Sequence, residues 1–150
     1  MTSANTPSGP TDSSVRPDAV LWMVDDNPAD LEIGGIVCET IGFPGHFLPF
    51  TTGQAALDHL TAVWGQEQER PDVILLDVNM PRMSGLAVLR ALRQDPRWAG
   101  VPVVMFSTSA NEEQIARRDG ATDYVIKPDV LRDTISAIRR VILRFCKVRP

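Results

Sequence analysis

The chain has 150 residues, of which 43% are hydrophobic and 23% charged, a length and composition typical of one soluble globular domain. It contains no apolar run close to the roughly 20 residues that a membrane span requires, and it begins without the basic and apolar segments of a signal peptide. The formal net charge of −4 gives no reason to expect nucleic-acid binding.

Residues 1–18 are rich in Thr, Ser, Pro and Gly and contain almost nothing to bury, so they are predicted to form a disordered tail. A single domain is predicted over residues 19–146, followed by a short tail over residues 147–150. Cys38 and Cys146 are far apart in the sequence and lack metal-ligand spacing, which predicts free thiols in a reducing cytoplasm.

The first apolar run, residues 19–24, predicts a buried strand that ends at two acidic residues, Asp25 and Asp26. Asn27 is a suitable N-cap for the helix that follows. Apolar residues recur at helical spacing over residues 28–41, and a proline occupies the first helical position.

Residues 46–51 predict a second, short strand that contains Pro49. Because proline has no N–H to donate to a neighbouring strand, this strand is expected at an edge of the sheet. An amphipathic helix is predicted over residues 53–64. The run Val-Ile-Leu-Leu at residues 73–76 then predicts a buried strand that ends at Asp77.

The second half of the chain repeats this alternation. A helix is predicted over residues 85–92, and an apolar strand over residues 101–106 ends at Ser107. A short charged helix is predicted over residues 111–118, and the strand over residues 123–126 ends at Lys127.

Asp129 is predicted to cap the last helix. The residues expected to face the sheet step by four and three along it: Leu131, Ile135, Ile138, Ile142 and Phe145.

Five strands that alternate with five helices predict an α/β fold with a doubly wound parallel sheet. The carboxyl ends of parallel strands meet at one edge, so the side chains that follow the strands are expected to lie together there. They are Asp25, Asp26, Asp77, Ser107 and Lys127.

Such a cluster requires a cation, because two like charges ~4 Å apart repel by about 4 kcal/mol at an effective dielectric constant of 20. Carboxylates with carbonyl and water ligands suit Mg²⁺. A carboxylate beside Mg²⁺, with a lysine and a hydroxyl close by, is equipped to attack phosphorus. The predicted product is an aspartyl phosphate.

Five segments, in this order, resemble the receiver domain of two-component response regulators: VDDNPAD, ILLDVNMP, GLAVL, PVVMFSTS and GATDYVIKP. The resemblance covers residues 19–146. It implies a flavodoxin-like fold with strand order 2-1-3-4-5, which agrees with the edge position inferred from Pro49. DNPAD and the STS motif are similar to those of stand-alone regulators that accompany bacteriophytochrome-type histidine kinases.

Within this resemblance, Asp77 corresponds to the phospho-acceptor and Asp26 to the direct Mg²⁺ ligand. Asp25 corresponds to the acid that holds metal-bound waters, and Asn79 to the residue whose backbone carbonyl binds the metal. Such a protein is not an enzyme with an external substrate, since it catalyses only its own phosphorylation and dephosphorylation.

Lys127 corresponds to the cation that pairs with the phosphoryl group, and the Lys127–Pro128 peptide bond is expected to be cis. Ser107 corresponds to the switch hydroxyl, and Tyr124 to the aromatic residue that turns inward with it. The output surface is expected on the fourth helix, fifth strand and fifth helix. The segment from Ser107 to Lys127 is about two residues shorter than usual, or roughly half a helical turn, so the fourth helix is expected to be short.

Each role has an alternative. The acid pair is also compatible with simple stabilisation of a helix N-terminus, and Lys127 with a solvated strand end. Ser107 is compatible with a strand-end cap, in which case Thr108 takes its role, and Tyr124 with an ordinary half-buried strand residue.

At the level of function, a Mg²⁺-dependent hydrolase is disfavoured by Asn79, because such enzymes carry a second carboxylate at that position. A docking module that works without phosphorylation remains the main alternative to a response regulator. A DNA-binding regulator is disfavoured because the chain ends soon after its fifth helix.

The expected partners are a sensor histidine kinase, which the resemblance suggests is of the bacteriophytochrome type, and a downstream target protein. The fifth helix is expected to form a homodimer or to dock a kinase, because Val130, Val141 and Leu143 lie off the stripe predicted to face the sheet.

Overall fold

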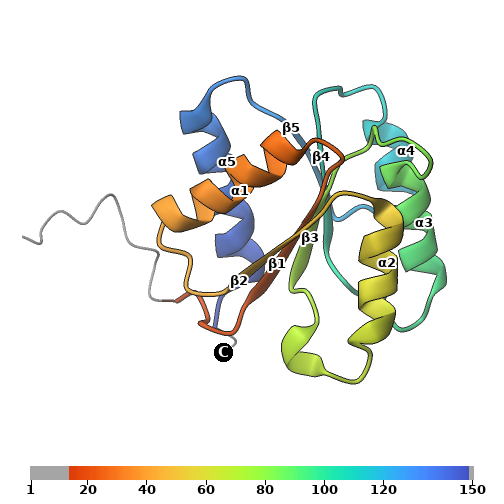
Figure 1. Ribbon diagram of the computed structural model, residues 1–150. Helices are drawn as coiled ribbons and strands as arrows, with labels where there is room; N and C mark the ends of the chain where they lie inside the picture. Colours follow the sequence, from red (N-terminus) through yellow and green to blue (C-terminus); the bar gives the residue numbers. More distant parts are fainter. Residues whose placement is uncertain (1–13, 149–150) are drawn as a thin grey trace, which may run out of the picture.

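The computed structural model describes residues 14–148, which form a parallel sheet covered by helices on both faces (Figure 1). The strands are β1 (Val20–Val24), β2 (His46–Phe50), β3 (Val73–Leu76), β4 (Val103–Ser107) and β5 (Asp123–Ile126). Their order is β2-β1-β3-β4-β5, and all neighbours pair in parallel. The predicted doubly wound five-stranded sheet and its strand order are confirmed.

Helices α1 and α5 cover one face of the sheet, and helices α2, α3 and α4 cover the other (Figure 1). The helices are α1 (Pro28–Thr40), α2 (Gly53–Ala62), α3 (Gly85–Gln94), α4 (Glu113–Arg118) and α5 (Leu131–Phe145). A 3₁₀ turn, η2 (Glu67–Glu69), lies between α2 and β3. Helix α4 has only six residues, as expected from the short segment before Lys127. No helix in residues 14–148 has the length and hydropathy needed to cross a membrane.

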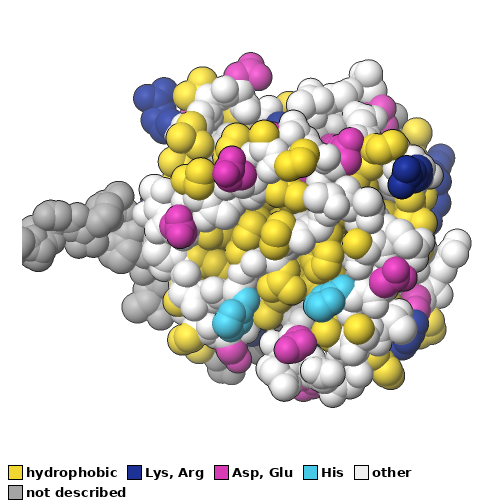
Figure 2. Space-filling model, in the orientation of Figure 1, with side chains coloured by type: hydrophobic (Ala, Val, Ile, Leu, Met, Phe, Trp, Pro, Cys, Tyr) yellow, Lys and Arg dark blue, Asp and Glu magenta, His cyan; other side chains and the backbone are white. Residues whose placement is uncertain are grey.

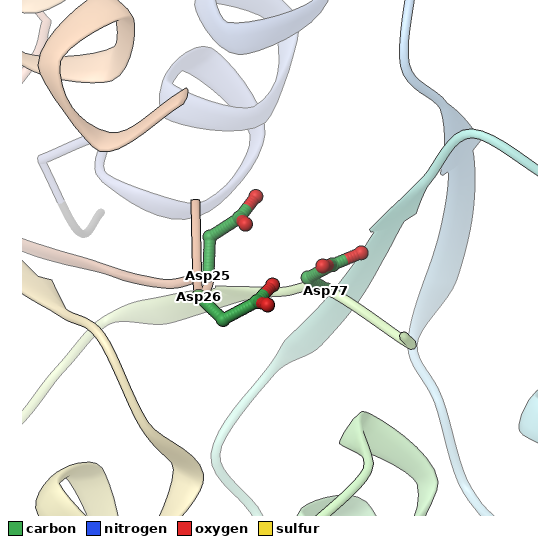
Figure 3. A group of neighbouring side chains, drawn as sticks. All are labelled: Asp25, Asp26 and Asp77. Atoms are coloured by element: carbon green, nitrogen blue, oxygen red, sulfur yellow. The ribbon is translucent and has the colours of Figure 1, made fainter. Parts of the chain in front are cut away.

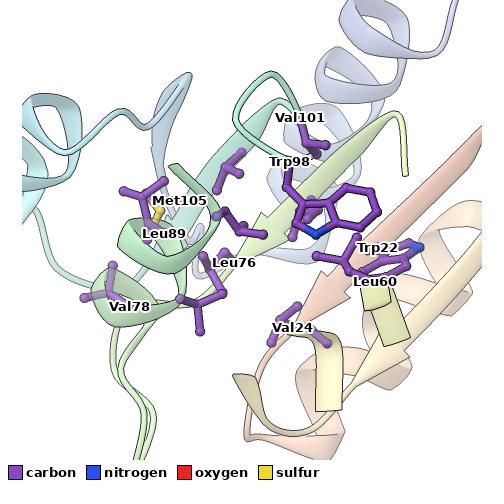
Figure 4. Close-up of a cluster of buried hydrophobic side chains, with 14 of the residues drawn as sticks. Trp22, Val24, Leu60, Leu76, Val78, Leu89, Trp98, Val101 and Met105 are labelled. Carbon is purple, nitrogen blue, oxygen red and sulfur yellow. The ribbon is translucent and has the colours of Figure 1, made fainter. Parts of the chain in front are cut away.

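Alternate residues of the central strands enter two separate cores, because successive side chains of a strand point to opposite faces of the sheet. Trp22, Leu76 and Met105 belong to the core beneath α2, α3 and α4 (Figure 4). Met23 and Leu75, each one residue away from a member of the first set, belong to the core beneath α1 and α5. Burial on both faces therefore explains why the central strands read as unbroken apolar runs.

Strand β2 is the edge strand, as its proline predicted. Pro49 is exposed, and no residue of β2 is fully buried, whereas every residue of β1 and β3 is. Proline is tolerated here because its nitrogen need not donate to a further strand.

The buried face of α5 differs from the predicted stripe. Ala137, Ile138, Val141 and Ile142 are buried, whereas Leu131 in the first turn is 53% exposed. The prediction that Val141 lies off the sheet-facing stripe is therefore wrong, because this side chain lies in the core with 7% exposure. Ile138 and Ile142 are buried as the stripe predicted, and Ile135 and Phe145 pack partly buried against the same core. The buried face also includes Ala137 and Val141, so it is wider than a four-and-three step of large side chains indicates.

Two local predictions near the end of β5 are also wrong. The N-cap residue of α5 is Val130, with no side-chain cap, so Asp129 does not cap this helix. Residues 14–148 contain no cis peptide bond, and the Lys127–Pro128 bond is trans, the isomer that an X–Pro bond favours by about 0.5–1 kcal/mol.

The predicted tail boundary at residue 18 also differs from the structure. Val15 is 3% exposed in the core under α1 and α5, and it forms an antiparallel bridge with Lys147. The side chain of Arg16 pairs with Asp72 at 2.5 Å. The domain therefore begins before residue 19, while the predicted tail residues 1–13 and 149–150 lie outside the described part of the chain.

Candidate functional site

Three carboxylates meet at the carboxyl edge of the sheet, where β1 and β3 end (Figure 3). Asp25 and Asp26 follow β1 directly, and Asp77 follows β3. One oxygen from each side chain lies within 4.8 Å of the others. Asp25 and Asp77 are buried and Asp26 is exposed, so the group opens to solvent on one side. The structure thus brings together the three acids that the sequence singled out.

The backbone holds Asp77 firmly. Its N–H donates to the carbonyl oxygen of Val24 at 2.9 Å, which continues the pairing of β3 with β1 beyond the strand. Gly85, the first residue of α3, packs so closely that an added Cβ would collide with the carbonyl of Asp77. A larger residue at position 85 would therefore displace the acid.

Burial raises the pKa of Asp77 to about 6, and the negative charge of Asp25 contributes in the same direction. The charge of Lys127 and a hydrogen bond from the backbone N–H of Asn79 oppose this rise. Because burial disfavours the ionised form, a cation bound beside this carboxylate would lower its pKa again.

Asp25 is held from two sides. Its Oδ1 accepts a hydrogen bond from the N–H of Asn27 at 2.9 Å, and its Oδ2 accepts one from Lys127 Nζ at 2.6 Å. Burial raises its pKa, against the lowering effect of these two donors. Asn27 in turn caps α1, since its side chain accepts from the N–H of Ala29 at 3.0 Å, as predicted.

Lys127 is the cation of the site. Its Nζ lies 2.6 Å from Asp25, 3.0 Å from Asp30 and 3.6 Å from Asp77. Burial lowers the pKa of Lys127, but hydrogen bonds to Asp25 and Asp30, with the charges around them, raise it above its ordinary value. The lysine is therefore charged, and its first two contacts are not with the predicted phospho-acceptor.

Ser107 ends β4 and is completely buried, whereas the neighbouring Thr108 is exposed. The Ser107 hydroxyl accepts a hydrogen bond from the N–H of Ser109 at 3.2 Å. Tyr124 is 7% exposed and points into the core beneath α2, α3 and α4, with its hydroxyl donating to the carbonyl of Ser109. Of the two candidate hydroxyls, that of Ser107 is buried at the strand end and that of Thr108 is exposed, and the switch role of Ser107 stays a prediction.

The donor set suits a hard divalent cation. Carboxylate oxygens are the ligands that Mg²⁺ prefers, and three carboxylates lie close together here, with the ammonium group of Lys127 paired to two of them. Asp25, Asp26, Asp77 and the predicted backbone carbonyl of Asn79 fit such an ion. Asn79 itself is exposed at the same edge, directly after the buried Val78.

One residue of this site was missed by the sequence analysis. Asp30, in the first turn of α1, accepts a hydrogen bond from Lys127 Nζ. The available signal was its spacing: a residue in the first helical turn after the Asp25–Asp26 pair returns toward the strand end. No role was assigned because its partner is 97 residues away in the sequence.

Comparison with known proteins agrees with the resemblance found in the motifs. The family model of the response regulator receiver domain matches residues 21–139. Response regulator Rcp1 of Synechocystis sp. (strain ATCC 27184 / PCC 6803 / Kazusa) is 33% identical over 101 residues, which cover 67% of this chain and 69% of Rcp1.

A second relative is the probable methanogenesis regulatory protein FilR2 of Methanothrix harundinacea (strain 6Ac). It is 30% identical over 125 residues, which cover 80% of this chain and 81% of FilR2. The chain spans only 50% and 49% of two DNA-binding response regulators that it also matches.

Among solved structures, the phosphorylated cyanobacterial phytochrome response regulator RcpA superposes with a TM-score of 0.75 at 27% identity, covering 85% of this chain and 93% of RcpA. The Mn²⁺-bound form of Rcp1 gives a TM-score of 0.74 at 28% identity, covering 88% and 97% of the two chains. Other solved neighbours include two bacteriophytochrome response regulators. The predicted likeness to phytochrome-associated regulators is confirmed.

Proposed function

Since the chain belongs to the family of response regulator receiver domains, we propose that it accepts a phosphoryl group from a histidine kinase on Asp77 and signals through phosphorylation-dependent protein contacts. The observation that carries this proposal is the position of Asp77. A buried carboxylate at the end of a central strand, beside two further acids and 3.6 Å from a lysine ammonium, has the surroundings of a nucleophile that handles phosphate.

In the proposed transfer, an oxygen of the Asp77 carboxylate attacks the phosphorus of a phosphohistidine. The new O–P bond forms as the N–P bond breaks, and the electron pair of that bond stays on the imidazole nitrogen, which takes up a proton. Attack by water on the same phosphorus later releases inorganic phosphate and restores the carboxylate. Apart from the phosphoryl donor, the protein is proposed to turn over no substrate.

Asp25, Asp26 and Asp77, with the carbonyl of Asn79, would hold Mg²⁺. When bound, this ion would neutralise the carboxylates and the charge that develops on the transferring phosphoryl group. Lys127 would provide a further positive charge for the phosphoryl oxygens, since its ammonium already lies within ion-pair distance of Asp77.

The proposed switch links the phosphoryl group to the far side of β4. The Ser107 hydroxyl would turn from the N–H of Ser109 toward a phosphoryl oxygen. Tyr124 bonds to the carbonyl of the same Ser109, so movement of that loop would reach the tyrosine ring and the surface formed by α4, β5 and α5. The phosphorylated protein would then differ from the unphosphorylated one by contacts that form only with the phosphoryl group.

A kinase of the bacteriophytochrome type is the proposed donor, because solved neighbours include phytochrome and bacteriophytochrome response regulators. Figure 2 shows hydrophobic side chains gathered over the face that carries α1 and β2. On α1, Ile33 and Ile36 are 37% and 48% exposed, which leaves apolar surface for a protein partner. The downstream target is also proposed to be a protein, not nucleic acid, given the net charge of −4.

Self-association is proposed through the start of α5. Val130 and Leu131 are 49% and 53% exposed, and Ile126 at the end of β5 is 44% exposed.

The protein is proposed to act in the cytoplasm, since both cysteines are free and buried, as in proteins of reducing compartments.

The test of the proposed function is incubation with acetyl phosphate and Mg²⁺, followed by intact-mass measurement. The wild type should gain the mass of one phosphoryl group, and Asp77→Asn should gain none. Absence of any labelling of the wild type, by acetyl phosphate or by a phosphorylated histidine kinase, would instead favour a docking module that works without phosphate.

A further inference from the structure

Lys127 has more acidic partners than the proposed chemistry uses. Asp30 Oδ2 accepts a hydrogen bond from Lys127 Nζ at 3.0 Å, and it comes from α1 and not from a strand end. The Asp30 side chain is 32% exposed, compared with 2% for Asp25 and 9% for Asp77. The lysine therefore bridges the buried acids and one acid at the rim.

An ammonium group has three N–H donors. Two of those of Lys127 reach Asp25 and Asp30, and the 3.6 Å separation from Asp77 is too long for a hydrogen bond. On its remaining side the lysine approaches the ring of Phe106, 6.0 Å from the ring centre. The ammonium group is thus shared between Asp25 and Asp30 and makes no hydrogen bond to the carboxylate that is proposed to react.

Lys127 and a bound metal ion would compete for the same carboxylates. Asp25 and Asp77 are proposed metal-site residues, yet they are also the nearest buried anions to Lys127. A divalent cation and an ammonium group repel one another when they share these acids. Within residues 14–148, Asp30 is the one ion-pair partner of Lys127 that is not a proposed metal-site residue.

We propose that Asp30 is a positioning residue, which gives the ammonium group of Lys127 a partner outside the metal site, so that Asp25, its nearest partner, and Asp77 become available to a divalent cation. This inference rests on the proposed function, because it concerns the same metal site. Space for the movement is present: Asp30 and Lys127 both line a cavity of about 220 Å³ between α1 and α5. The lysine can therefore withdraw toward Asp30 without displacing the core.

The test is the Mg²⁺ dissociation constant of the full chain, measured by calorimetric titration. Asp30→Asn should weaken Mg²⁺ binding on the order of tenfold, because Lys127 then remains on Asp25 and Asp77. Asp30→Glu, which restores the negative charge, should recover most of the affinity. Glu32→Gln removes one charge from an exposed position on the same helix and should change the affinity less than about twofold.

The decisive comparison repeats Asp30→Asn in a Lys127→Ala background. If Asp30 acts through the lysine, the substitution should have little effect once the lysine is absent, as a double-mutant cycle reveals. An equal loss of affinity in both backgrounds would show that Asp30 attracts the cation directly, and would overturn the inference. Unchanged affinity of Asp30→Asn would overturn it as well.

The outcomes separate this inference from the proposed function. A wild type that binds no Mg²⁺ and takes up no phosphoryl group contradicts the proposed function itself. A wild type that binds Mg²⁺ and is phosphorylated, with Asp30→Asn indistinguishable from it, contradicts only the role of Asp30. Circular dichroism of each variant confirms that it is folded, as expected for a side chain that is one third exposed.

Discussion

The ammonium group of Lys127 lies 3.6 Å from the carboxylate of Asp77, close enough for attraction but too far for a hydrogen bond. A phosphoryl group on Asp77 would extend toward this ammonium with three further acceptor oxygens. The lysine therefore has a contact to gain on phosphorylation, and such gained contacts are what allow a ligand to shift a conformational equilibrium.

Loss of this contact should separate phosphorylation from the response to it. Lys127→Ala should still accept some phosphoryl group from acetyl phosphate, but amide exchange in β4 and β5 should change much less than in the wild type. Hydrogen exchange with mass-spectrometric detection measures this difference. A full wild-type change in exchange in Lys127→Ala would show that the lysine does not transmit the signal.

Ser107→Ala should behave in the same way, since it removes the buried hydroxyl at the end of β4. Thr108→Ala is the matched control, because that hydroxyl is exposed. If Thr108→Ala abolishes the exchange response and Ser107→Ala preserves it, the switch position is one residue later than proposed.

The raised pKa of Asp77 predicts that, in the absence of metal, the wild type and Asp77→Asn differ in stability by an amount that depends on pH. Between pH 3.8 and about 6 the folded state binds more protons at this carboxyl than the unfolded state does, so wild-type stability falls as pH rises through this range. Asp77→Asn lacks this effect. In EDTA at pH 7.5 it should be more stable than the wild type by up to about 3 kcal/mol, the free energy that corresponds to a carboxyl pKa of about 6 in place of 3.8.

Urea unfolding at pH 7.5 and at pH 3.5 measures this effect. The advantage of Asp77→Asn should largely disappear at the lower pH, where the wild-type carboxyl is mostly protonated in both the folded and the unfolded state. An advantage of equal size at both pH values would show that it arises from packing and not from charge.

Mg²⁺ should stabilise the wild type and not a variant that lacks a proposed direct ligand. Adding Mg²⁺ at 100 times its dissociation constant should raise the free energy of unfolding by about 2.7 kcal/mol. Asp26→Asn should lose most of this gain together with its labelling by acetyl phosphate. Equal stabilisation of both proteins by Mg²⁺ would remove Asp26 from the set of ligands.

Several features of the fold were predictable because they depend on local chemistry. Pro49 marked the edge strand, since proline cannot donate a hydrogen bond to a further strand, and Asn27 capped α1 as its side chain predicts. The unbroken apolar runs before Asp25 and Asp77 followed from burial on both sheet faces. The meeting of the three acids followed from parallel topology.

Other features depend on tertiary packing that the sequence pattern does not encode. Val15 stands alone among polar residues, so no periodicity revealed that it would be buried. The rotation of α5 is set by how it packs on the sheet, which placed Val141 inside and Leu131 outside. The contact between Asp30 and Lys127 joins residues that are 97 positions apart in the sequence, so it depends on the folded arrangement of α1 and β5.

The exposed start of α5 leads to a prediction about self-association. If the protein pairs through Leu131 and its neighbours, light scattering should show a larger mass with beryllofluoride and Mg²⁺ as a phosphoryl mimic, and Leu131→Glu should abolish this increase. Val148→Glu adds the same charge three residues beyond the opposite end of α5, where the side chain is 55% exposed, and should leave association intact. Val141→Glu is unsuitable because it would place a charge in the core.

A wild type that stays monomeric at every concentration, with and without the mimic, would contradict pairing through α5. If Leu131→Glu also accepts phosphate from a kinase as fast as the wild type, the exposed start of α5 is not a kinase contact either.

The most direct test of the phospho-acceptor is chemical trapping of the acyl phosphate. Borohydride reduces an aspartyl phosphate to homoserine, so the protein treated with acetyl phosphate and Mg²⁺ is reduced, digested and sequenced by tandem mass spectrometry. Homoserine should appear at position 77, and its appearance should require both reagents. Homoserine at another aspartate, or a phosphoryl group that resists borohydride on a serine, threonine or histidine, would contradict Asp77 as the acceptor.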